Sequence, residues 1–321
     1  MIRILISGGA GYIGGVLSYN LYDKNINYAV IDNLSTSSKR NLPPNTLFYK
    51  GNINNETLLQ RILIEFEPTH IVHLAASLNV SESELNKKKY YINNIKNSKI
   101  FLNFFIRNGI KNYIFASTAA LYNKNSSSKK IEDKNYTPSN YYGKTKLIIE
   151  KYLLNYKKKF NLNLKILRFF NVVGADHKLR SGSLSKKSNQ LFNCLSMSIK
   201  TGKIFHIFGK NLKTKDGSCV RDYVDVIDLV KVIIFFIKSR TVYKYDIFNI
   251  GTNKGHSVLE ILNLFNKILN KNITYLFLNK RKGDPTHSVC NNLRLKKIYK
   301  FKFSSIKVSI NRHYFFYKKN Y

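Results

Sequence analysis

The chain has 321 residues, 44% of them hydrophobic, which suits one large or two interlocked α/β domains of a globular protein. Its 54 Lys and Arg against 18 Asp and Glu give a formal charge of +36, a value typical of nucleic-acid-binding or membrane-surface proteins. The basic residues are mostly lysines scattered in short runs, and no nucleic-acid-binding motif is present. We therefore expect no nucleic-acid partner and interpret the charge as compositional bias on a solvated surface, where it can also steer an anionic substrate.

Other features argue against a membrane or secreted protein. The longest apolar stretch, 226–237, contains Asp228 and Lys231 and is too short to cross a bilayer. The chain opens directly on a predicted strand, so we expect no signal peptide. Its three cysteines show neither metal nor disulfide spacing. We expect a soluble, cytoplasmic protein without a metal or a membrane partner.

The first predicted strand, 2–7, runs into a glycine-rich turn before a helix at 12–24. Gly8, Gly11 and Gly14 fit the spacing G-x-x-G-x-x-G. Gly9, Gly11 and Gly14 also fit the spacing G-x-G-x-x-G. Glycine suits a tight turn whose backbone approaches a pyrophosphate, and the following helix offers free N–H groups and a positive dipole end. The pattern predicts a dinucleotide site, against the alternative of a β–α turn without a ligand.

The second strand, 28–32, ends in Asp32, eighteen residues after Gly14. A carboxylate there can accept hydrogen bonds from both hydroxyls of an adenosine ribose and would repel a 2′-phosphate. The sequence therefore favours NAD over NADP. The alternative is a solvated loop residue.

Four more strands are predicted at 46–50, 69–74, 111–117 and 163–169, with helices near 55–66, 84–108 and 140–159. This alternation predicts an α/β fold with a doubly wound, Rossmann-like parallel sheet, whose ligands lie at the carboxyl ends of the strands.

Strand 111–117 leads into Thr118, and the helix at 140–159 carries Tyr142 and Lys146 on one face, at i and i+4. An ammonium beside a phenol favours the phenolate, so we expect a Tyr142 pKa below its reference near 10 and a role as general base. Thr118 or Ser117 would bridge the phenol and a substrate hydroxyl by hydrogen bonds, although such a residue can also be a plain turn residue.

After residue 171 the pattern changes. A polar loop at 175–188 precedes helices near 189–201 and 225–238, a strand at 246–250, a capping box opening a helix at Ser257 and a basic terminal helix at 304–321. We predict an NAD-binding domain over 1–171, to which segments near 225–250 return. A smaller, mainly substrate-binding α/β domain would cover 172–321.

Several motifs along nearly the whole chain resemble those of the extended short-chain dehydrogenase/reductases, and within them the UDP-glucose 4-epimerases. The motifs include Gly8-Gly9-Ala10-Gly11-Tyr12-Ile13-Gly14, Tyr142-Gly143-Lys144-Thr145-Lys146, Leu167-Arg168-Phe169-Phe170-Asn171, Asp216-Gly217-Ser218-Cys219-Val220-Arg221-Asp222-Tyr223-Val224 and Arg281-Lys282-Gly283-Asp284. The last two blocks are the more specific for sugar-nucleotide epimerases.

The resemblance implies an NAD site along the carboxyl ends of the strands. Its residues would be Gly8, Gly11, Tyr12, Ile13, Gly14, Asp32, Asn33, Asn52, Ile53, Leu74, Ala75, Ala76, Asn93, Lys146 and Phe170. Two positions depart from the family pattern and bear on cofactor retention: Asn52 stands where an Asp is usual, and Leu78 where many relatives have a Lys.

It also implies a UDP-sugar site. The residues would be Thr118, Tyr142, Asn171, Gln190, Leu191, Arg221, Tyr223, Arg281, Asp284 and Ser288. Arginine is suited to fork onto a diphosphate, although Arg221 can instead form a structural ion pair with an acid such as Asp222 or Asp225. A small Ser288 would leave room for an N-acetyl group.

The implied activity is reversible, NAD-dependent C4 epimerisation of UDP-glucose and UDP-galactose through a 4-keto sugar, carried out by a homodimer. A UDP-N-acetylglucosamine 4-epimerase, or another sugar-nucleotide-modifying enzyme of this family, stays open. A 4,6-dehydratase is disfavoured because Ala119 and Ala120 replace the acidic pair of those enzymes. The non-enzyme alternative is a decayed protein that binds sugar nucleotides or nucleic acid.

Overall fold

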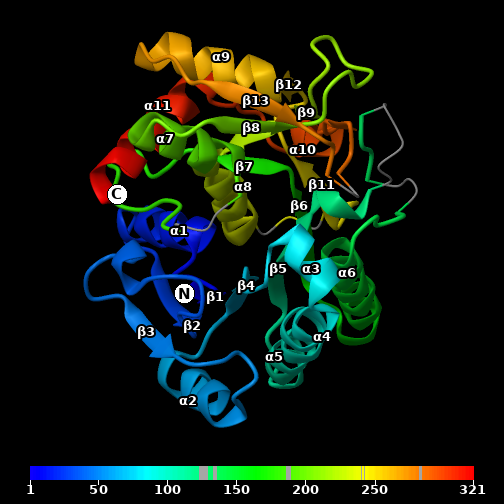
Figure 1. Ribbon diagram of the computed structural model, residues 1–321. Coiled ribbons are helices and arrows are strands. Elements are labelled where there is room, and N and C mark those ends of the chain that lie inside the picture. The colour runs from blue at the N-terminus through cyan, green and yellow to red at the C-terminus, as the bar shows by residue number, and fades with distance from the viewer. Residues whose placement is uncertain (123–128, 133–135, 186–188, 240, 242, 282–283) are drawn as a thin grey trace.

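The computed structural model describes residues 1–122, 129–132, 136–185, 189–239, 241, 243–281 and 284–321. A seven-stranded sheet, parallel throughout, runs in the order β11-β6-β5-β4-β1-β2-β3 (Figure 1). The strands are β1 (Arg3–Ser7), β2 (Asn27–Asp32), β3 (Leu47–Lys50), β4 (His70–His73), β5 (Asn112–Thr118), β6 (Asn163–Phe169) and β11 (Ile247–Ile250). The predicted doubly wound α/β fold is confirmed.

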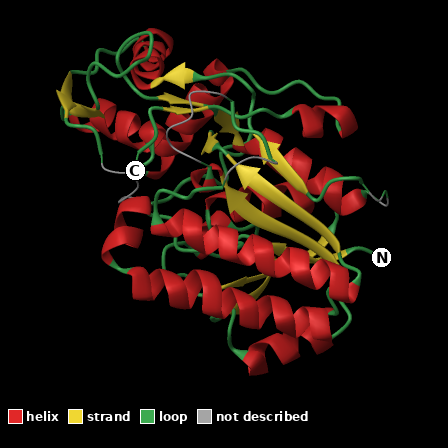
Figure 2. Ribbon diagram, turned by 90° about the vertical axis from the view of Figure 1, so that its right-hand side faces the viewer, coloured by secondary structure: helices red, strands yellow, loops and turns green. Residues whose placement is uncertain are grey.

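Helices cover both faces of the sheet (Figure 2). One face holds α1 (Tyr12–Tyr22) and α8 (Val226–Lys238), and the other holds α2 (Glu56–Phe66), α5 (Ser98–Arg107) and α6 (Tyr141–Phe160). Side chains of a strand point to alternate faces, so Ile4 and Ile6 pack with α1 and α8 while Leu5 packs on the opposite side. Burial on both faces explains why the strands are almost continuously apolar.

The strand order reverses between β1 and β4, which is where a doubly wound sheet opens a crevice at its carboxyl ends. Gly8 follows β1 and Leu74 follows β4, and the Leu74 N–H donates to the Ser7 carbonyl at 3.0 Å. The glycine turn therefore lies at this switch point.

The single helix predicted at 84–108 is wrong in detail. The structure has α3 (Val80–Leu85), α4 (Lys87–Tyr90), a π-helical segment η2 (Tyr91–Asn97) and then α5. Asn79 and Asn86 cap α3 and α4 by accepting backbone N–H bonds, and Asn86 leaves the helical conformation at φ −126° and ψ 63°. Asparagine favours helix caps over helix interiors, so Asn79 and Asn86 each begin a new short helix in place of the single predicted one.

The remaining elements lie mostly in the upper half of Figure 1. They are η1 (Lys39–Asn41), η3 (Ala119–Leu121), β7 (Asn171–Val173), α7 (Leu191–Thr201), β8 (Phe205–Phe208), β9 (Val220–Arg221), β10 (Tyr223–Asp225), β12 (His256–Ser257), α9 (Val258–Leu269), β13 (Tyr275–Leu278), β14 (His287–Ser288), α10 (Leu293–Ile298) and α11 (Ile306–Asn320). Helices α7, α9 and α11 share a separate hydrophobic core with β8. The predicted capping box is present at Ser257 and Glu260.

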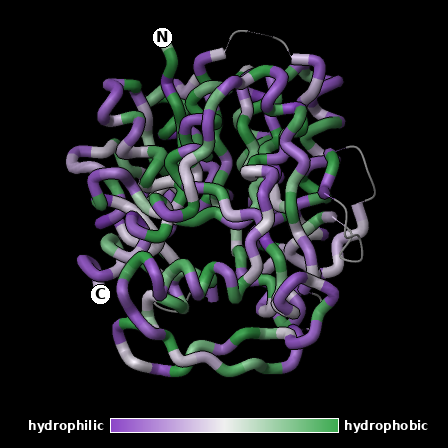
Figure 3. The backbone as a smooth tube through the Cα atoms, turned by 90° about the horizontal axis from the view of Figure 1, so that it is seen from above, coloured by the Kyte–Doolittle hydropathy of each residue, from purple (hydrophilic) through white to green (hydrophobic). Residues whose placement is uncertain are grey.

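Although it comes late in the chain, β11 pairs in parallel with β6 and extends the sheet. The division of the chain at residue 171 stays a prediction. None of the helices in the described part of the chain has the length and apolarity that crossing a bilayer requires. Hydrophilic stretches lie on every side of the outline of the molecule (Figure 3), as expected for dispersed lysines.

Candidate active site

The glycine turn between β1 and α1 leaves no space for side chains. Gly8 has a φ of +73°, and a Cβ on it would lie 2.7 Å from the Ala75 backbone. A Cβ on Gly14 would lie 2.5 Å from the Cα of Gly9, inside the turn itself. No side chain caps α1 at Gly11, so the first N–H groups of the helix stay available to an anion.

Asp32, at the end of β2, faces this turn. Its Oδ2 accepts the Ala10 N–H at 3.1 Å, and its Oδ1 accepts from the Leu34 N–H and the Ser37 hydroxyl, both at 2.8 Å. The side chain is buried rather than a solvated loop residue. Its neighbour Asn33 donates to the Oδ1 of Asn52 at 2.6 Å. A buried carboxylate and a polar pair beyond it thus lie beside the turn, as the predicted NAD site requires.

Four other residues of the predicted cofactor site make contacts that support the fold. The Tyr12 hydroxyl donates to the Gly174 carbonyl at 2.7 Å, and Ile13 packs against the core around α1 and α8. Ile53 is buried in the opposite core, and Phe170 packs with Tyr122.

The segment η2 joins the cofactor side of the site to the catalytic helix. Asn93 donates to the Ser77 hydroxyl at 3.0 Å. Its buried neighbour Asn94 accepts the Ser77 N–H at 2.8 Å and donates to the Thr145 hydroxyl at 3.2 Å, and Thr145 donates to the Tyr142 carbonyl. Sequence reasoning missed Asn94, because nothing in the linear pattern shows that it reaches α6.

Tyr142, Thr118 and Lys146 come together at the carboxyl end of β5. The Thr118 side chain faces the Tyr142 hydroxyl and acts to lower the pKa of Tyr142. Lys146 lies one turn further along α6, where its Nζ donates to the Ala116 carbonyl at 2.8 Å and lies 4.9 Å from the centre of the Phe115 ring. All three candidates from the sequence therefore share one site.

The expected lowering of the Tyr142 pKa is wrong for the protein without ligands. Burial raises the pKa of Tyr142 to about 12, and the hydrogen bond from Thr118 opposes this shift only in part. Burial also lowers the pKa of Lys146 to about 7, against the attraction of Glu150. Desolvation disfavours both charged forms, and the pairing of Tyr142 with Lys146 that the sequence suggested is not among the causes of either pKa shift.

Gly143 lets α6 pack close to the end of β5. Sequence reasoning missed this residue as well. A Cβ on Gly143 would lie 2.5 Å from the Ala120 carbonyl oxygen in η3. Asn140 caps this end of α6 by accepting the Gly143 N–H at 2.8 Å. The close packing holds Tyr142 against Thr118.

A buried ion pair joins α6 to β6. Arg168 on β6 makes two hydrogen bonds to Glu150, at 3.0 and 2.6 Å, and donates to the Tyr122 hydroxyl at 2.9 Å. Ser117 also donates to Glu150. Removing one partner of such a pair would leave a buried charge uncompensated.

The predicted substrate residues gather around β9 and β14. Arg221 donates to the Oδ1 of Asp284 at 2.7 Å. Asp284, not Asp222 or Asp225, is therefore its ion-pair partner. Ser288 is buried in β14, in register with Arg221. Residues 282 and 283 of the Arg281–Asp284 motif lie outside the described part of the chain.

The other substrate candidates lie on several elements. The guanidinium of Arg281 lies 3.7 Å from the centre of the Phe208 ring, and Tyr223 is buried. Asn171 is exposed in β7, Gln190 directly precedes α7 and Leu191 is its first residue. Within the described residues, no hydrogen bond or ion pair joins the Arg221 group to Tyr142.

Comparison with known proteins identifies the family of the chain. The model of the NAD dependent epimerase/dehydratase family matches residues 4–251. The chain is 33% identical over 303 residues to the UDP-glucose 4-epimerase of Lactobacillus helveticus, covering 94% of this chain and 92% of that protein. It is 32% identical over 297 residues to the UDP-glucose 4-epimerase of Azospirillum brasilense, covering 92% of this chain and 85% of that one.

Solved structures agree as well. The Bifidobacterium longum UDP-glucose 4-epimerase, in complex with NAD+ and UDP, has a TM-score of 0.93 at 26% identity, with 99% of this chain and 98% of that chain covered. The UDP-Glc/GlcNAc 4-epimerase of Campylobacter jejuni has a TM-score of 0.84 at 27% identity, with 99% and 100% covered. The chain is thus an enzyme that belongs to the NAD dependent epimerase/dehydratase family.

Proposed function

We propose that this enzyme interconverts UDP-glucose and UDP-galactose by inverting C4 of the hexose with the help of bound NAD. The observation that carries the proposal is that Tyr142 on α6 faces Thr118 at the carboxyl end of β5, with Lys146 one turn away, in a sheet whose switch point holds the glycine turn. Relatives and structural neighbours named UDP-glucose 4-epimerase, one of them with NAD+ and UDP, support it.

The residues around the switch point would hold NAD. The first N–H groups of α1 would bind its pyrophosphate, and Asp32 would accept from the adenosine ribose. Lys146 would donate to the other ribose. When bound, NAD supplies the redox chemistry, because it can accept a hydride from C4 and give it back.

Tyr142 would manage the proton. In its phenolate form it takes the proton of the 4-hydroxyl as the carbon is oxidised to a 4-keto sugar, and it returns that proton when the carbon is reduced again. The Thr118 hydroxyl stabilises the phenolate by donating to it, and the Lys146 ammonium adds a nearby positive charge. Oxidation and reduction cancel over one cycle, so no external oxidant is consumed.

Inversion requires the keto sugar to present its other face before it is reduced. The UDP portion must therefore be held while the hexose turns. Arg221 and Arg281 would bind the diphosphate, since a guanidinium pairs with phosphate oxygens in two-pronged geometry. The Asp284 carboxylate already orients Arg221 for this role.

Ser288 favours a second candidate, C4 epimerisation of UDP-N-acetylglucosamine. Its small side chain is buried beside Arg221, at the position expected to limit the bulk of the sugar. The similar Campylobacter jejuni protein is named a UDP-Glc/GlcNAc 4-epimerase. Assaying UDP-galactose and UDP-N-acetylgalactosamine in parallel separates the two activities.

We also propose a cytoplasmic homodimer. Tyr91 and Ile92 on η2 and Ile148 on α6 expose apolar side chains on neighbouring elements, which suits an interface formed by these helices. None of the three cysteines forms a disulfide, which suits a reducing compartment.

The first test follows UDP-glucose formation from UDP-galactose by purified protein without added NAD. We expect turnover, and we expect Tyr142→Phe to lower kcat by roughly 10²- to 10⁴-fold, the usual contribution of a general acid–base group, with UDP binding unchanged. Tyr141→Phe, which removes the neighbouring hydroxyl on the same helix, is the matched control and should keep its activity. Full activity of Tyr142→Phe would contradict the proposal.

A further inference from the structure

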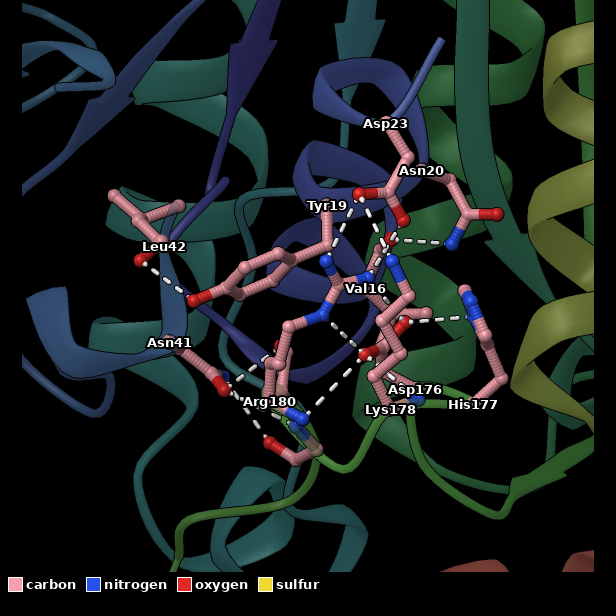
Figure 4. Close-up of polar contacts among 12 residues, drawn as sticks. Val16, Tyr19, Asn20, Asp23, Asn41, Leu42, Asp176, His177, Lys178 and Arg180 are labelled. Carbon is pink, nitrogen blue, oxygen red and sulfur yellow. Dashed lines mark hydrogen bonds and ion pairs between the residues drawn. The ribbon is translucent and has the colours of Figure 1, made fainter. Parts of the chain in front are cut away.

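A short segment after β7 crosses the outside of α1 and contacts η1 (Figure 4). This segment, residues 174–183, is called the strap below. It has two anchors, one at the C-terminal end of α1 and one deep beside the glycine turn. The two anchors use adjacent residues of the strap but meet opposite ends of α1, so a variant of each can be compared.

The outer anchor is Arg180. Its guanidinium donates to both carboxylate oxygens of Asp23, at 2.9 and 2.7 Å, and to those of Asp176, at 2.7 and 3.2 Å. It also lies 4.3 Å from the centre of the Tyr19 ring. These contacts tie the strap to the end of α1 opposite to the glycine turn.

The inner anchor is Asn41, the last residue of η1, which is 2% exposed. Its Nδ2 donates to the carbonyl oxygens of Gly11 and Gly182, both at 3.1 Å, and of Ala10 at 3.3 Å. Its Oδ1 accepts from the Ser181 hydroxyl at 2.8 Å and the Gly182 N–H at 3.1 Å. Both donors and both lone pairs of the amide are therefore in use.

Gly15 shows how tightly this anchor is packed. A Cβ at this position would lie 2.5 Å from the Ser181 hydroxyl and 2.6 Å from the Asn41 carbonyl oxygen. Gly15 is not part of the phosphate-binding glycine pattern. Its lack of a side chain instead lets η1 and the strap rest directly on the first turn of α1.

The bonds from Asn41 to the glycine turn also fix the direction of the backbone donors. In a trans peptide unit the C=O and the following N–H point in opposite directions. The Gly11 carbonyl accepts the Gly15 N–H of α1 at 2.8 Å and the Asn41 amide at 3.1 Å, so Asn41 adds a second hold on a peptide unit whose Tyr12 N–H points away from Asn41, on the side where α1 offers its free donors.

We propose that Asn41 is a positioning residue for the cofactor, since it locks the glycine turn so that the N–H groups at the start of α1 are preorganised for the NAD pyrophosphate. The proposal rests on the NAD site of the proposed function. Asn41 acts through the turn, and its contribution is to hold donors that would otherwise have to be ordered at the moment of binding.

The test compares NAD retention in three variants. Asn41→Asp replaces the donating amide nitrogen by an oxygen while the other oxygen stays, and Asn41→Ala adds no charge should Asn41→Asp fail to fold. Arg180→Met removes the outer anchor and is the matched control. The measurements are NAD bound per chain after gel filtration, the NAD dissociation rate and the thermal midpoint.

We expect NAD to leave the Asn41 variants about tenfold faster or more, the effect of losing one or two hydrogen bonds. Arg180→Met should lower the thermal midpoint yet keep the wild-type dissociation rate. The proposal is overturned if the Asn41 variants keep that rate, or if both anchors change retention in proportion to lost stability. A wild-type protein that binds no NAD at all would overturn the proposed function as well.

Discussion

The Tyr142 hydroxyl lies between two opposing influences. Burial disfavours its anion, and the hydroxyl of Thr118 stabilises that anion by a hydrogen bond. Lys146 adds a cation nearby, but its own buried ammonium loses protons at a pKa of about 7. The chemistry therefore depends on how far the neighbours of Tyr142 offset the cost of burying its charge.

Thr118→Val should show how much the Thr118 hydroxyl lowers the pKa of Tyr142 against the effect of burial. Without the hydrogen bond the Tyr142 pKa rises further above about 12, so less phenolate is present at a given pH. We expect kcat near pH 7 to fall by roughly tenfold or more and the rising limb of the pH–rate profile to shift to higher pH. Thr118→Ser keeps the hydroxyl and is the control. An unshifted profile in Thr118→Val would contradict this role.

At this scale the sequence predicts which side chains meet, but not how their environment acts on them. The i,i+4 spacing of Tyr142 and Lys146 brings them to one face because α6 is continuous there. The direction of their pKa shifts could not be predicted, because burial depends on packing around the site. The ion-pair partner of Arg221, Asp284, was missed for the same reason, since it lies on a distant loop.

Helix α6 depends on a close contact at its first turn. Gly143 touches the η3 backbone, and this contact sets the distance between the helix and the end of β5. The elements that carry the site are therefore held by backbone packing as well as by side chains.

Gly143→Ala should separate the two elements. Alanine normally stabilises a helix by up to about 1 kcal/mol over glycine, but here its Cβ would lie 2.5 Å from the Ala120 carbonyl oxygen. We expect a loss of about 1–3 kcal/mol in the free energy of unfolding from overpacking, and a fall in kcat of about a hundredfold from misplacing Tyr142. Denaturant unfolding and steady-state kinetics measure both.

The control for this variant is Lys144→Ala, the exposed neighbour on the same turn. It should leave kcat and stability close to the wild type. A Gly143→Ala protein with wild-type kcat would show that the contact does not position the catalytic helix.

Elements were predicted well where one physical signal dominates. Apolar runs identified every strand from β1 to β6, including the edge strand β3, which is only partly buried. The region before α5 was predicted less well, because the caps at Asn79 and Asn86 and the wider turn of η2 compete with the apolar periodicity.

At the scale of the whole molecule, the site exists because of strand order. The chain brings the end of β1 beside the end of β4, so that Gly8 and Ala75 are in contact. Pattern reasoning predicted a doubly wound sheet, but the pairing of strands distant in sequence, such as β11 with β6, follows from the packing of complete layers.

The charge of +36 is also a property of the whole molecule, and it should act on association with an anionic UDP-sugar. We expect KM to rise several-fold between about 0.01 and 0.5 M salt, where the Debye length falls from about 30 Å to a few ångströms, while kcat changes little. A KM independent of salt would show that steering is negligible. An uncharged viscosity agent serves as control for slower diffusion.

The position of β11 affects how the chain can be made. During synthesis β6 leaves the ribosome with one edge unpaired, and the whole of residues 170–246 must follow before β11 can cover it. The apolar face that α8 later shields stays open during much of the same interval. A nascent chain in that state has an exposed strand edge beside exposed hydrophobic surface, the combination that favours aggregation and chaperone binding. A fragment ending at residue 171 would remain in that condition permanently.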